Sequence, residues 1–181
     1  MFKPKHVYIE KEALDYTLGK ELKKQFEDMQ IPVYILESNR VNFLRGKSVQ
    51  EKYEIGKRVL VIGVRRTLEF QSCKPSAHYQ LPLVTGCIGK CEYCYLNTNL
   101  KDKPFTRIYV NLDDILKKAK RYTQTGKFKP TIFEGSATSD PVPVEPYTHA
   151  LAKSIEFFAK DPNTRFRFVT KFTDIDDLLH I

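Results

Sequence analysis

The stretch Thr85-Gly86-Cys87-Ile88-Gly89-Lys90-Cys91-Glu92-Tyr93-Cys94-Tyr95-Leu96 places three of the four cysteines within eight residues. Their spacing is C-x3-C-x2-C. Thiolates this close in sequence can surround one metal centre only if the backbone turns sharply, and Gly86 and Gly89 supply residues that tolerate positive φ. The stretch therefore predicts a loop whose three thiolates share one metal centre.

Three clustered thiolates are compatible with more than one kind of site. A mononuclear zinc ion needs a fourth ligand, which Cys73 or His78 would have to supply from a different segment. A 4Fe-4S cluster normally takes one thiolate per iron, so three thiolates leave one iron open to a substrate or cofactor. Reduced cysteines packed in a loop without any metal are the third alternative. We favour the cluster with an open iron.

The composition is that of a globular protein with a basic surface. The chain has 181 residues, of which 41% are hydrophobic and 29% are charged, enough for one domain or a small domain plus part of another. Its apolar runs are too short to span a membrane and its first residues lack a signal-peptide core, so we expect no membrane association and a cytoplasmic location. The net charge of +8 favours a polyanionic partner such as DNA or RNA.

Residues 1–72 are expected to form an N-terminal α/β domain with a β-α-β-α-β order. Short strands are predicted at residues 6–10, 33–36 and 59–64. Helical spacing recurs at Leu14, Leu18, Leu22, Phe26 and Met29. Ser48 and Glu51 form a capping-box pattern, which predicts a second helix that ends near Gly56.

Residues 73–181 are expected to contain a series of strand-loop-helix units. Strands are predicted at residues 81–85, 107–110, 131–134 and 165–170, and helices at residues 112–122 and near 151–158. Asn111 is the expected cap of the first of these helices, and Thr173 with Asp176 predicts a further helix start. Alternating β and α segments argue for parallel strands with right-handed crossovers.

The predicted strand ends locate one active site. In parallel sheets and barrels, ligands bind at the carboxyl ends of the strands. The cysteine loop, the loop that contains Ser139 and Asp140, and Lys171 each follow a predicted strand. We therefore expect all three to meet at one rim.

The chain resembles the spore photoproduct lyase family of the radical SAM superfamily. The cysteine spacing alone specifies only the superfamily, whereas Pro75-Ser76-Ala77, Cys94-Tyr95-Leu96 and the segment around Ser139 point to the family. The resemblance covers essentially the whole chain. It implies an N-terminal α/β domain over residues 1–72 and, over residues 73–181, the first part of a partial TIM barrel, truncated after about four βα units.

The resemblance implies a DNA-repair lyase with a radical mechanism. Cys87, Cys91 and Cys94 would hold a 4Fe-4S cluster, and S-adenosyl-L-methionine at its open iron would yield a 5′-deoxyadenosyl radical. The substrate would be the spore photoproduct, 5-thyminyl-5,6-dihydrothymine, which is reverted to two thymines in ultraviolet-damaged DNA. An external electron donor of the flavodoxin or ferredoxin type, a monomeric state and a location in the spore core or germinating spore are also implied.

Four residues are expected by resemblance to bind S-adenosyl-L-methionine: Tyr93, Ser139, Asp140 and Lys171. Lys171 would pair with the methionine carboxylate, since a carboxylate in a partly dry site needs a cation. Tyr93 would contact the adenine. The alternatives are a surface lysine at a strand end and a tyrosine packed under the cysteine loop. Tyr93 and Tyr95 are also expected to help return a hydrogen atom to the cofactor.

Ala137 departs from the family pattern. The family has its hydrogen-donor cysteine between Gly135-Ser136 and Thr138-Ser139-Asp140, where this chain has Ala137. A methyl group cannot deliver a hydrogen atom in place of a thiol, so we expect a variant that cleaves the cofactor but quenches the thymine radical abnormally. Cys73 could substitute as donor, but its position before the first barrel strand favours an inert thiol.

Two rival functions stay open at the level of sequence. One is a radical SAM enzyme that acts on another nucleic acid or on a peptide. The other is a non-catalytic iron-sulfur or zinc-stabilised binding module. Anaerobic reconstitution distinguishes the non-catalytic binding module from the enzymes. Assay with a thymine-dimer dinucleotide distinguishes the lyase from a radical SAM enzyme with another substrate.

Overall fold

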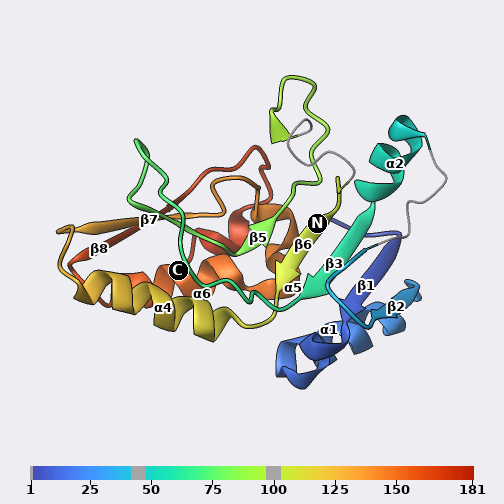
Figure 1. Cartoon of the computed structure of the whole chain (residues 1–181), viewed down its shortest axis with the longest axis horizontal. Coiled ribbons are helices and arrows are strands. Elements are labelled where there is room, and N and C mark those ends of the chain that lie inside the picture. Colours follow the sequence, from blue (N-terminus) through green and yellow to red (C-terminus); the bar gives the residue numbers. More distant parts are fainter. Residues whose placement is uncertain (1, 42–47, 97–102) are drawn as a thin grey trace. The chain divides into compact units, whose positions relative to one another are not determined.

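The computed structural model describes residues 2–41, 48–96 and 103–181 and has the expected α/β class (Figure 1). The chain forms two compact units, each built from two segments. The first unit is Met1–Val64 with Val84–Val110, and the second is Arg65–Leu83 with Asn111–Ile181. The domains expected over residues 1–72 and 73–181 have a single boundary, whereas in the structure Val84–Val110 belongs with the N-terminal segment. No helix among the described residues is long and apolar enough to cross a membrane.

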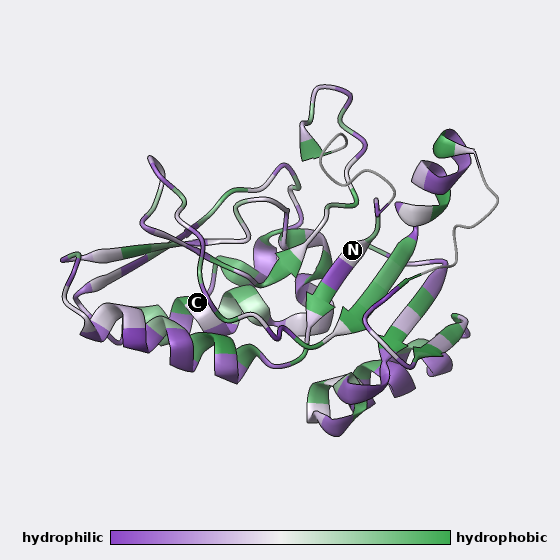
Figure 2. Cartoon of the chain, in the orientation of Figure 1, coloured by the Kyte–Doolittle hydropathy of each residue, from purple (hydrophilic) through white to green (hydrophobic). Residues whose placement is uncertain are grey.

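The first unit is organised on a five-stranded sheet with the order β2-β1-β3-β6-β5. The strands are β1 (His6–Glu10), β2 (Val33–Leu36), β3 (Val59–Gly63), β5 (Val84–Thr85) and β6 (Thr106–Tyr109). β2, β1, β3 and β6 run parallel, and every residue of β3 is buried, as its apolar run predicts. Figure 2 shows β3 as a uniformly hydrophobic strand.

The helices of the first unit confirm the order predicted for the N-terminal segment. They are the 3₁₀ helix η1 (Lys11–Asp15), α1 (Thr17–Asp28) and α2 (Val49–Gly56). α1 buries Leu22 and Phe26, which lie one turn apart on its apolar face. At the start of α2, the Glu51 amide donates to the Ser48 hydroxyl at 3.2 Å, and the Ser48 amide donates to the Glu51 carboxylate at 3.0 Å. The predicted capping box is therefore present.

The strand predicted over residues 81–85 is wrong as a single element. The structure divides it into β4 (Tyr79–Leu81) and β5, which belong to different sheets and different units. Pro82 lies between them and cannot donate a ladder hydrogen bond, which accounts for the interruption. β5 also pairs antiparallel with β6, whereas the prediction was a parallel strand.

The second unit contains a three-stranded parallel sheet with the order β4-β7-β8. Its further elements are α4 (Leu112–Gln124), β7 (Thr131–Gly135), η2 (Val142–Val144), α5 (Glu145–Thr148), α6 (Ala150–Ala159), β8 (Thr164–Phe168) and η3 (Asp176–Leu178). Figure 1 shows α4 and α6 on the same side of β7 and β8. Phe158 of α6 stacks on Phe133 of β7 at 4.8 Å and on Phe166 of β8 at 5.5 Å between ring centroids. This aromatic layer joins helix and sheet.

Two predicted caps differ from the structure. Asn111 is the N-cap residue of α4, but its side chain makes no cap hydrogen bond. Its Oδ1 accepts instead from the Arg65 amide at 2.8 Å, and its Nδ2 donates to the Arg65 carbonyl at 3.1 Å, so it ties α4 to the preceding segment. The helix predicted at Thr173 and Asp176 is wrong. The structure has only the short η3, with Ile175 as N-cap and no side-chain cap.

Candidate functional site

The cysteine loop leaves the first unit's sheet through a turn that requires glycine. Gly86 has φ +78°, and a Cβ atom there would lie 2.3 Å from the Phe105 carbonyl oxygen. The Thr85 and Tyr109 hydroxyls are 2.7 Å apart and hold the start of the loop against β6. The positive φ predicted for Gly86 is thus confirmed.

Gly89 is needed for space and not for a positive φ. A Cβ atom at Gly89 would lie 3.3 Å from the Cys87 sulfur and 3.7 Å from the Cys91 sulfur. The Gly89 amide also points to the Cys87 sulfur, at 3.3 Å. Two sulfurs therefore flank one bare backbone position, and an added Cβ atom would crowd the Cys87 sulfur while only touching the Cys91 sulfur.

The thiols of this loop fit an iron-sulfur donor set, although they are not closed around a single position. Cys87, Cys91 and Cys94 are reduced and partly exposed. The Cys94 amide donates to the Cys91 carbonyl at 3.0 Å, which draws the second and third cysteines into one turn. Among the described residues, no three His, Cys, Asp or Glu side chains already converge on a metal position. The assignment of the three cysteines as ligands stays a prediction.

Helix α2 anchors the cysteine loop through two lysines that sequence reasoning missed. The Lys57 ammonium donates to the Cys87 carbonyl at 2.7 Å, and Lys90 of the loop pairs with Glu54 of α2. Lys57 is only 3% exposed, and its ammonium lies 5.2 Å from the centre of the Tyr53 ring. A lysine between a helix end and an apolar strand carries no periodic signal of burial, so the sequence could not single it out.

The charges around Lys57 come mainly from the cysteine loop. Burial lowers the pKa of the Lys57 ammonium, and the three loop thiols act in the opposite direction. None of the ion pairs within the described residues gives Lys57 a carboxylate partner. A buried cation thus lies next to the segment that would carry three thiolates.

The two tyrosines that flank Cys94 project into solvent. Tyr93 is 81% exposed and Tyr95 is 57% exposed. The alternative that Tyr93 packs under the cysteine loop is therefore wrong. Both phenols are open to a ligand or substrate, while their expected roles in adenine contact and hydrogen return stay predictions.

The loop after β7 holds the second group of predicted residues. Ser136 has φ +55°, and its amide donates to the Leu81 carbonyl at 2.8 Å, at the end of the neighbouring strand. The Ser139 amide donates back to the Ser136 carbonyl at 2.8 Å. Ala137 is therefore held inside a tight turn at the carboxyl end of the sheet, and it is partly exposed.

Asp140 joins this loop to the segment after β8. Its carboxylate is buried and accepts from the Lys171 amide at 2.8 Å and from the Thr170 hydroxyl at 2.9 and 3.0 Å. The Val142 amide adds a further donor at 3.2 Å. Both carboxylate oxygens are thus engaged with the protein, which makes Asp140 suited to position Lys171. The Lys171 side chain is exposed.

The predicted site residues divide between the two compact units. Cys87, Cys91, Cys94, Tyr93 and Tyr95 belong to the first unit, and Ala137, Ser139, Asp140 and Lys171 belong to the second. Within the second unit, the two expected strand-end segments do meet, through Asp140. The meeting of both groups at one rim stays a prediction.

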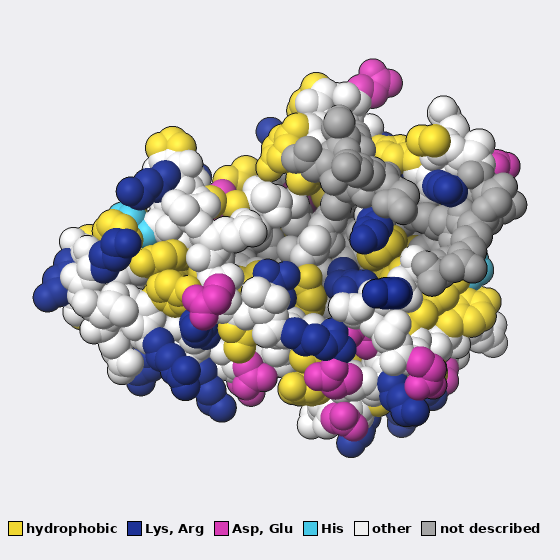
Figure 3. All heavy atoms as spheres, in the orientation of Figure 1, with side chains coloured by type: hydrophobic (Ala, Val, Ile, Leu, Met, Phe, Trp, Pro, Cys, Tyr) yellow, Lys and Arg dark blue, Asp and Glu magenta, His cyan; other side chains and the backbone are white. Residues whose placement is uncertain are grey.

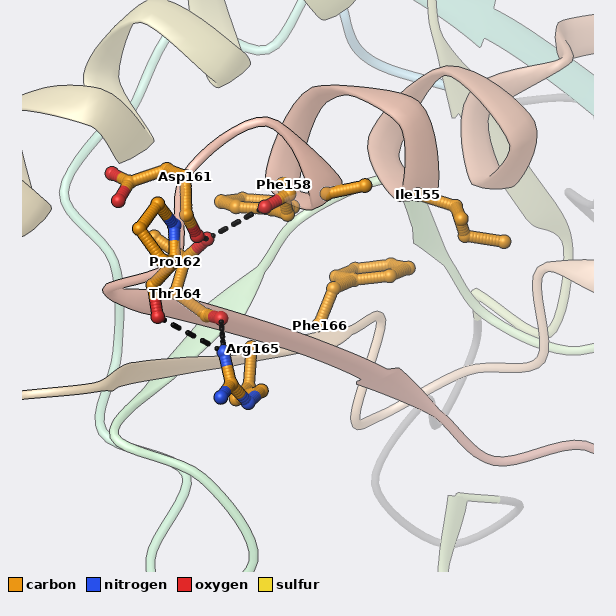
Figure 4. Close-up of a pocket in the computed structure, with 8 residues that line it drawn as sticks. Ile155, Phe158, Asp161, Pro162, Thr164, Arg165 and Phe166 are labelled. Atoms are coloured by element: carbon orange, nitrogen blue, oxygen red, sulfur yellow. Dashed lines mark hydrogen bonds between the residues drawn. The ribbon is translucent and has the colours of Figure 1, made fainter.

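A hollow lies between α6 and β8, at the edge of the second unit's hydrophobic core (Figure 4). Phe158, Phe166 and Ile155 form its apolar wall. The Arg165 guanidinium is occupied by the Pro162 and Thr164 carbonyls, at 3.0 and 2.7 Å. The lining offers no converging acid, base or nucleophile, and we assign no ligand to it.

Comparison with known proteins identifies the family. The family model described as spore photoproduct lyase matches residues 2–181. The chain belongs to the spore photoproduct lyase family. The expected resemblance is therefore confirmed over essentially the whole chain.

Curated spore photoproduct lyases match this chain over about half of their own length. The protein of Clostridium acetobutylicum is 52% identical over 177 residues, which are 98% of this chain and 53% of that protein. The protein of Bacillus subtilis is 46% identical over 179 residues, which are 98% of this chain and 52% of that protein.

Solved structures of spore photoproduct lyase share the fold of this chain. A double mutant with bound AdoMet and dinucleoside spore photoproduct superposes with a TM-score of 0.94 at 50% identity. The match covers 98% of this chain and 53% of that chain. A complex with dinucleoside spore photoproduct also gives a TM-score of 0.94, at 49% identity. The likeness is consistent with the expected first part of a radical SAM barrel.

Proposed function

We propose that these residues are part of a spore photoproduct lyase, a DNA-repair enzyme that reverts the spore photoproduct to two thymines. The observation that carries the proposal is the loop with the reduced thiols of Cys87, Cys91 and Cys94, in a chain that matches the family from residue 2 to 181. Solved relatives with bound AdoMet and dinucleoside spore photoproduct support the cofactor and substrate class.

The proposed ligands of the 4Fe-4S cluster are Cys87, Cys91 and Cys94. When bound, the cluster supplies the electron that cleaves the sulfonium of S-adenosyl-L-methionine. The partly exposed thiols leave one side of the loop open to the cofactor. The buried Lys57 ammonium fixes the loop on α2, so that the ligands need less ordering when they bind iron, whereas the exposed Lys90–Glu54 pair adds little.

The residues after β7 and β8 are proposed to bind the methionine moiety. Lys171 pairs with its carboxylate, and Ser139 donates a hydrogen bond to it. Asp140 acts through Lys171, because its carboxylate holds the Lys171 amide and the Thr170 hydroxyl. Tyr93, which is exposed, is available to contact the adenine.

We propose that this chain differs from the family pattern at one step, the return of a hydrogen atom to the thymine radical. The family resemblance puts the donor thiol at Ala137, which has none. Tyr93 and Tyr95 are the phenols proposed to relay hydrogen to the cofactor. Cys73 is the one cysteine outside the loop. It is partly exposed and its sulfur lies 3.5 Å from the Ser76 hydroxyl, so it is the thiol to test as a substitute donor.

The partners follow from the substrate and the chemistry. DNA that contains thymine lesions suits the net charge of +8. An external electron donor of the flavodoxin or ferredoxin type, a monomeric state and a cytoplasmic location in spores complete the proposal.

Anaerobic reconstitution tests this proposal. The whole protein that contains these residues should bind about four irons per chain, release 5′-deoxyadenosine under reduction and convert the dinucleoside photoproduct to thymines. A colourless zinc protein would indicate the binding module. Cofactor cleavage without repair of the lesion, together with turnover of an RNA base or a peptide, would indicate the rival radical enzyme.

A further inference from the structure

Two lysines lie against one aromatic stack at an edge of the second unit, and a third is exposed next to that stack in the chain. The Lys74 and Lys127 ammonium groups lie 5.8 and 5.4 Å from the centre of the Phe128 ring. That ring stacks on His78 at 3.8 Å with an interplanar angle of 5°. Lys129 is exposed beside them, with its side chain over Gly126. We call Lys74, Lys127 and Lys129, with Phe128 and His78, the lysine-aromatic patch.

The stack holds the patch in place. The His78 Nδ1 accepts from the Ile132 amide at 2.9 Å, and the His78 amide donates to the Ile132 carbonyl at 3.0 Å, so its ring is fixed to β7. Phe128 lies flat on that ring. The two lysines are thus drawn toward the ring by cation-π contacts, which favour this arrangement of their charges.

The lysine-aromatic patch is built from segments that carry no acidic residue. Segments 71–83 and 115–133, which build and flank it, contain no Asp or Glu. None of the ion pairs within the described residues involves its three lysines. In Figure 3, basic side chains gather around a histidine over the adjoining ends of β7 and β8. Crowded like charges repel one another, which favours an anionic partner at this surface.

We propose that the lysine-aromatic patch, which lies at the amino end of β7, binds the phosphate backbone of DNA outside the site at the carboxyl ends of the strands. Separate lysines on an exposed edge are point charges suited to successive phosphates, whereas a small anion is usually held by groups that converge in a pocket. Lysine-phosphate contacts position the duplex and carry no sequence information, as a lesion enzyme requires. The partner's identity rests on the proposed function, because that function acts on DNA.

A triple variant with Lys74→Ala, Lys127→Ala and Lys129→Ala tests the patch in the whole protein. Its affinity for a short undamaged duplex should fall at least tenfold at low salt. The slope of log affinity against log salt should become shallower by about 0.9 for each phosphate that the variant no longer neutralises. Turnover of the dinucleoside photoproduct should not change, because that substrate lacks flanking phosphates.

Two matched variants make the test specific. Replacing Lys3, Lys20 and Lys24 with alanine removes the same charge from exposed positions of the first unit and should leave the affinity within twofold. Replacing the three patch lysines with arginine keeps the charge and should preserve binding. Equal losses of affinity in both alanine variants would show that only net charge matters and would overturn the proposal.

The remaining outcomes separate the patch from the proposed function. Unchanged duplex affinity in the patch variant overturns the patch, even if the enzyme repairs the dinucleoside. Lost dinucleoside turnover in that variant also overturns it, because the lysines would then serve the site itself. If inorganic phosphate stabilises the wild-type protein but not the variant, and duplex binding is unaffected, the patch is a small-anion site. A wild-type protein that binds duplex but repairs nothing leaves the patch standing and rejects the proposed function.

Discussion

The Lys57 ammonium lies 2.7 Å from the Cys87 carbonyl oxygen, with Lys57 almost fully buried. A buried cation is costly to desolvate, and a protein gains little stability from one that has no counter-charge. Three thiolates in the adjoining loop would give this charge a counterpart. The arrangement therefore makes most sense when the loop carries negative charge.

Lys57→Met should separate metal retention from folding. Loss of the buried ammonium removes a charge-assisted hydrogen bond, but it also removes a desolvation cost, so the metal-free protein should unfold at nearly the same urea concentration. Iron retained after anaerobic reconstitution and gel filtration should fall severalfold. Lys90→Met, which removes the exposed lysine of the same loop, is the control and should retain most of the iron. If Lys57→Met lowers the urea midpoint of the metal-free protein as well as the iron content, Lys57 has a purely structural role.

Gly86→Ala should destabilise the first unit more than Gly126→Ala destabilises the second. Both glycines have positive φ, which costs an alanine about 1 kcal/mol. A Cβ atom at Gly86 would also lie 2.3 Å from the Phe105 carbonyl, whereas at Gly126 it would only reach Lys129 at 3.7 Å. Urea unfolding should therefore show a larger loss for Gly86→Ala, and similar losses would contradict the steric argument.

Much of the first unit could be predicted because its signals are local. The apolar run of β3 and the capping box at Ser48 and Glu51 determine elements through neighbouring residues alone, and both are present. The split at Pro82 has a local signal, because a proline interrupts a strand, whereas the antiparallel pairing of β5 depends on which strand the chain meets, which periodicity does not encode.

The candidate site was only partly predictable for the same reason. Cys87, Cys91 and Cys94 share one loop and can be recognised by their spacing. The burial of Lys57 depends on contacts between segments far apart in the chain, and no pattern in the sequence signals it. The segment after Thr173 forms only the short η3, and Leu179 is exposed, because a capping pattern does not specify the tertiary packing that stabilises a helix.

Asp140→Asn should weaken the binding of S-adenosyl-L-methionine more than it affects folding. An amide has one acceptor oxygen and one donor nitrogen, so it cannot accept from both the Lys171 amide, which is bonded to Oδ2, and the Val142 amide, which is bonded to Oδ1. If poorer positioning of Lys171 costs about 1.5–3 kcal/mol of binding free energy, the affinity for S-adenosyl-L-methionine falls roughly tenfold to a hundredfold. Calorimetric titration measures it. Asp161→Asn, which changes an exposed turn, should bind normally.

Glu145 should make the stability of the second unit depend on pH. Its carboxylate accepts from the Leu151 and Ala152 amides at 2.8 and 2.9 Å, and burial raises its pKa above the ordinary value. A carboxyl group whose pKa is higher in the folded state contributes its full stabilisation of the fold at pH values below its ordinary pKa. That contribution is lost as the pH rises through the raised pKa. The free energy of unfolding should fall across that window. Glu145→Gln should flatten the fall, whereas Glu156→Gln, at an exposed position of α6, should not.

Ala137→Cys should change how the thymine radical is quenched. Ala137 lies in the tight turn between Ser136 and Ser139, at the carboxyl end of β7, so a thiol there can be added without displacing a buried side chain. With lesion-containing dinucleoside as substrate, we expect more intact thymine and fewer abnormally quenched products, at an unchanged rate of cofactor cleavage. The product ratio, measured by chromatography with deuterated solvent, reports the donor.

Cys73→Ala is the paired variant, since Cys73 is the one cysteine outside the set proposed to bind iron. If Cys73 is inert, Cys73→Ala leaves the product ratio as it is, and Ala137→Cys alone shifts it toward two thymines. A collapse of normal product in Cys73→Ala that Ala137→Cys rescues would instead make Cys73 the donor of this chain. No change in the ratio with Ala137→Cys in either background would show that the turn after β7 does not face the thymine radical.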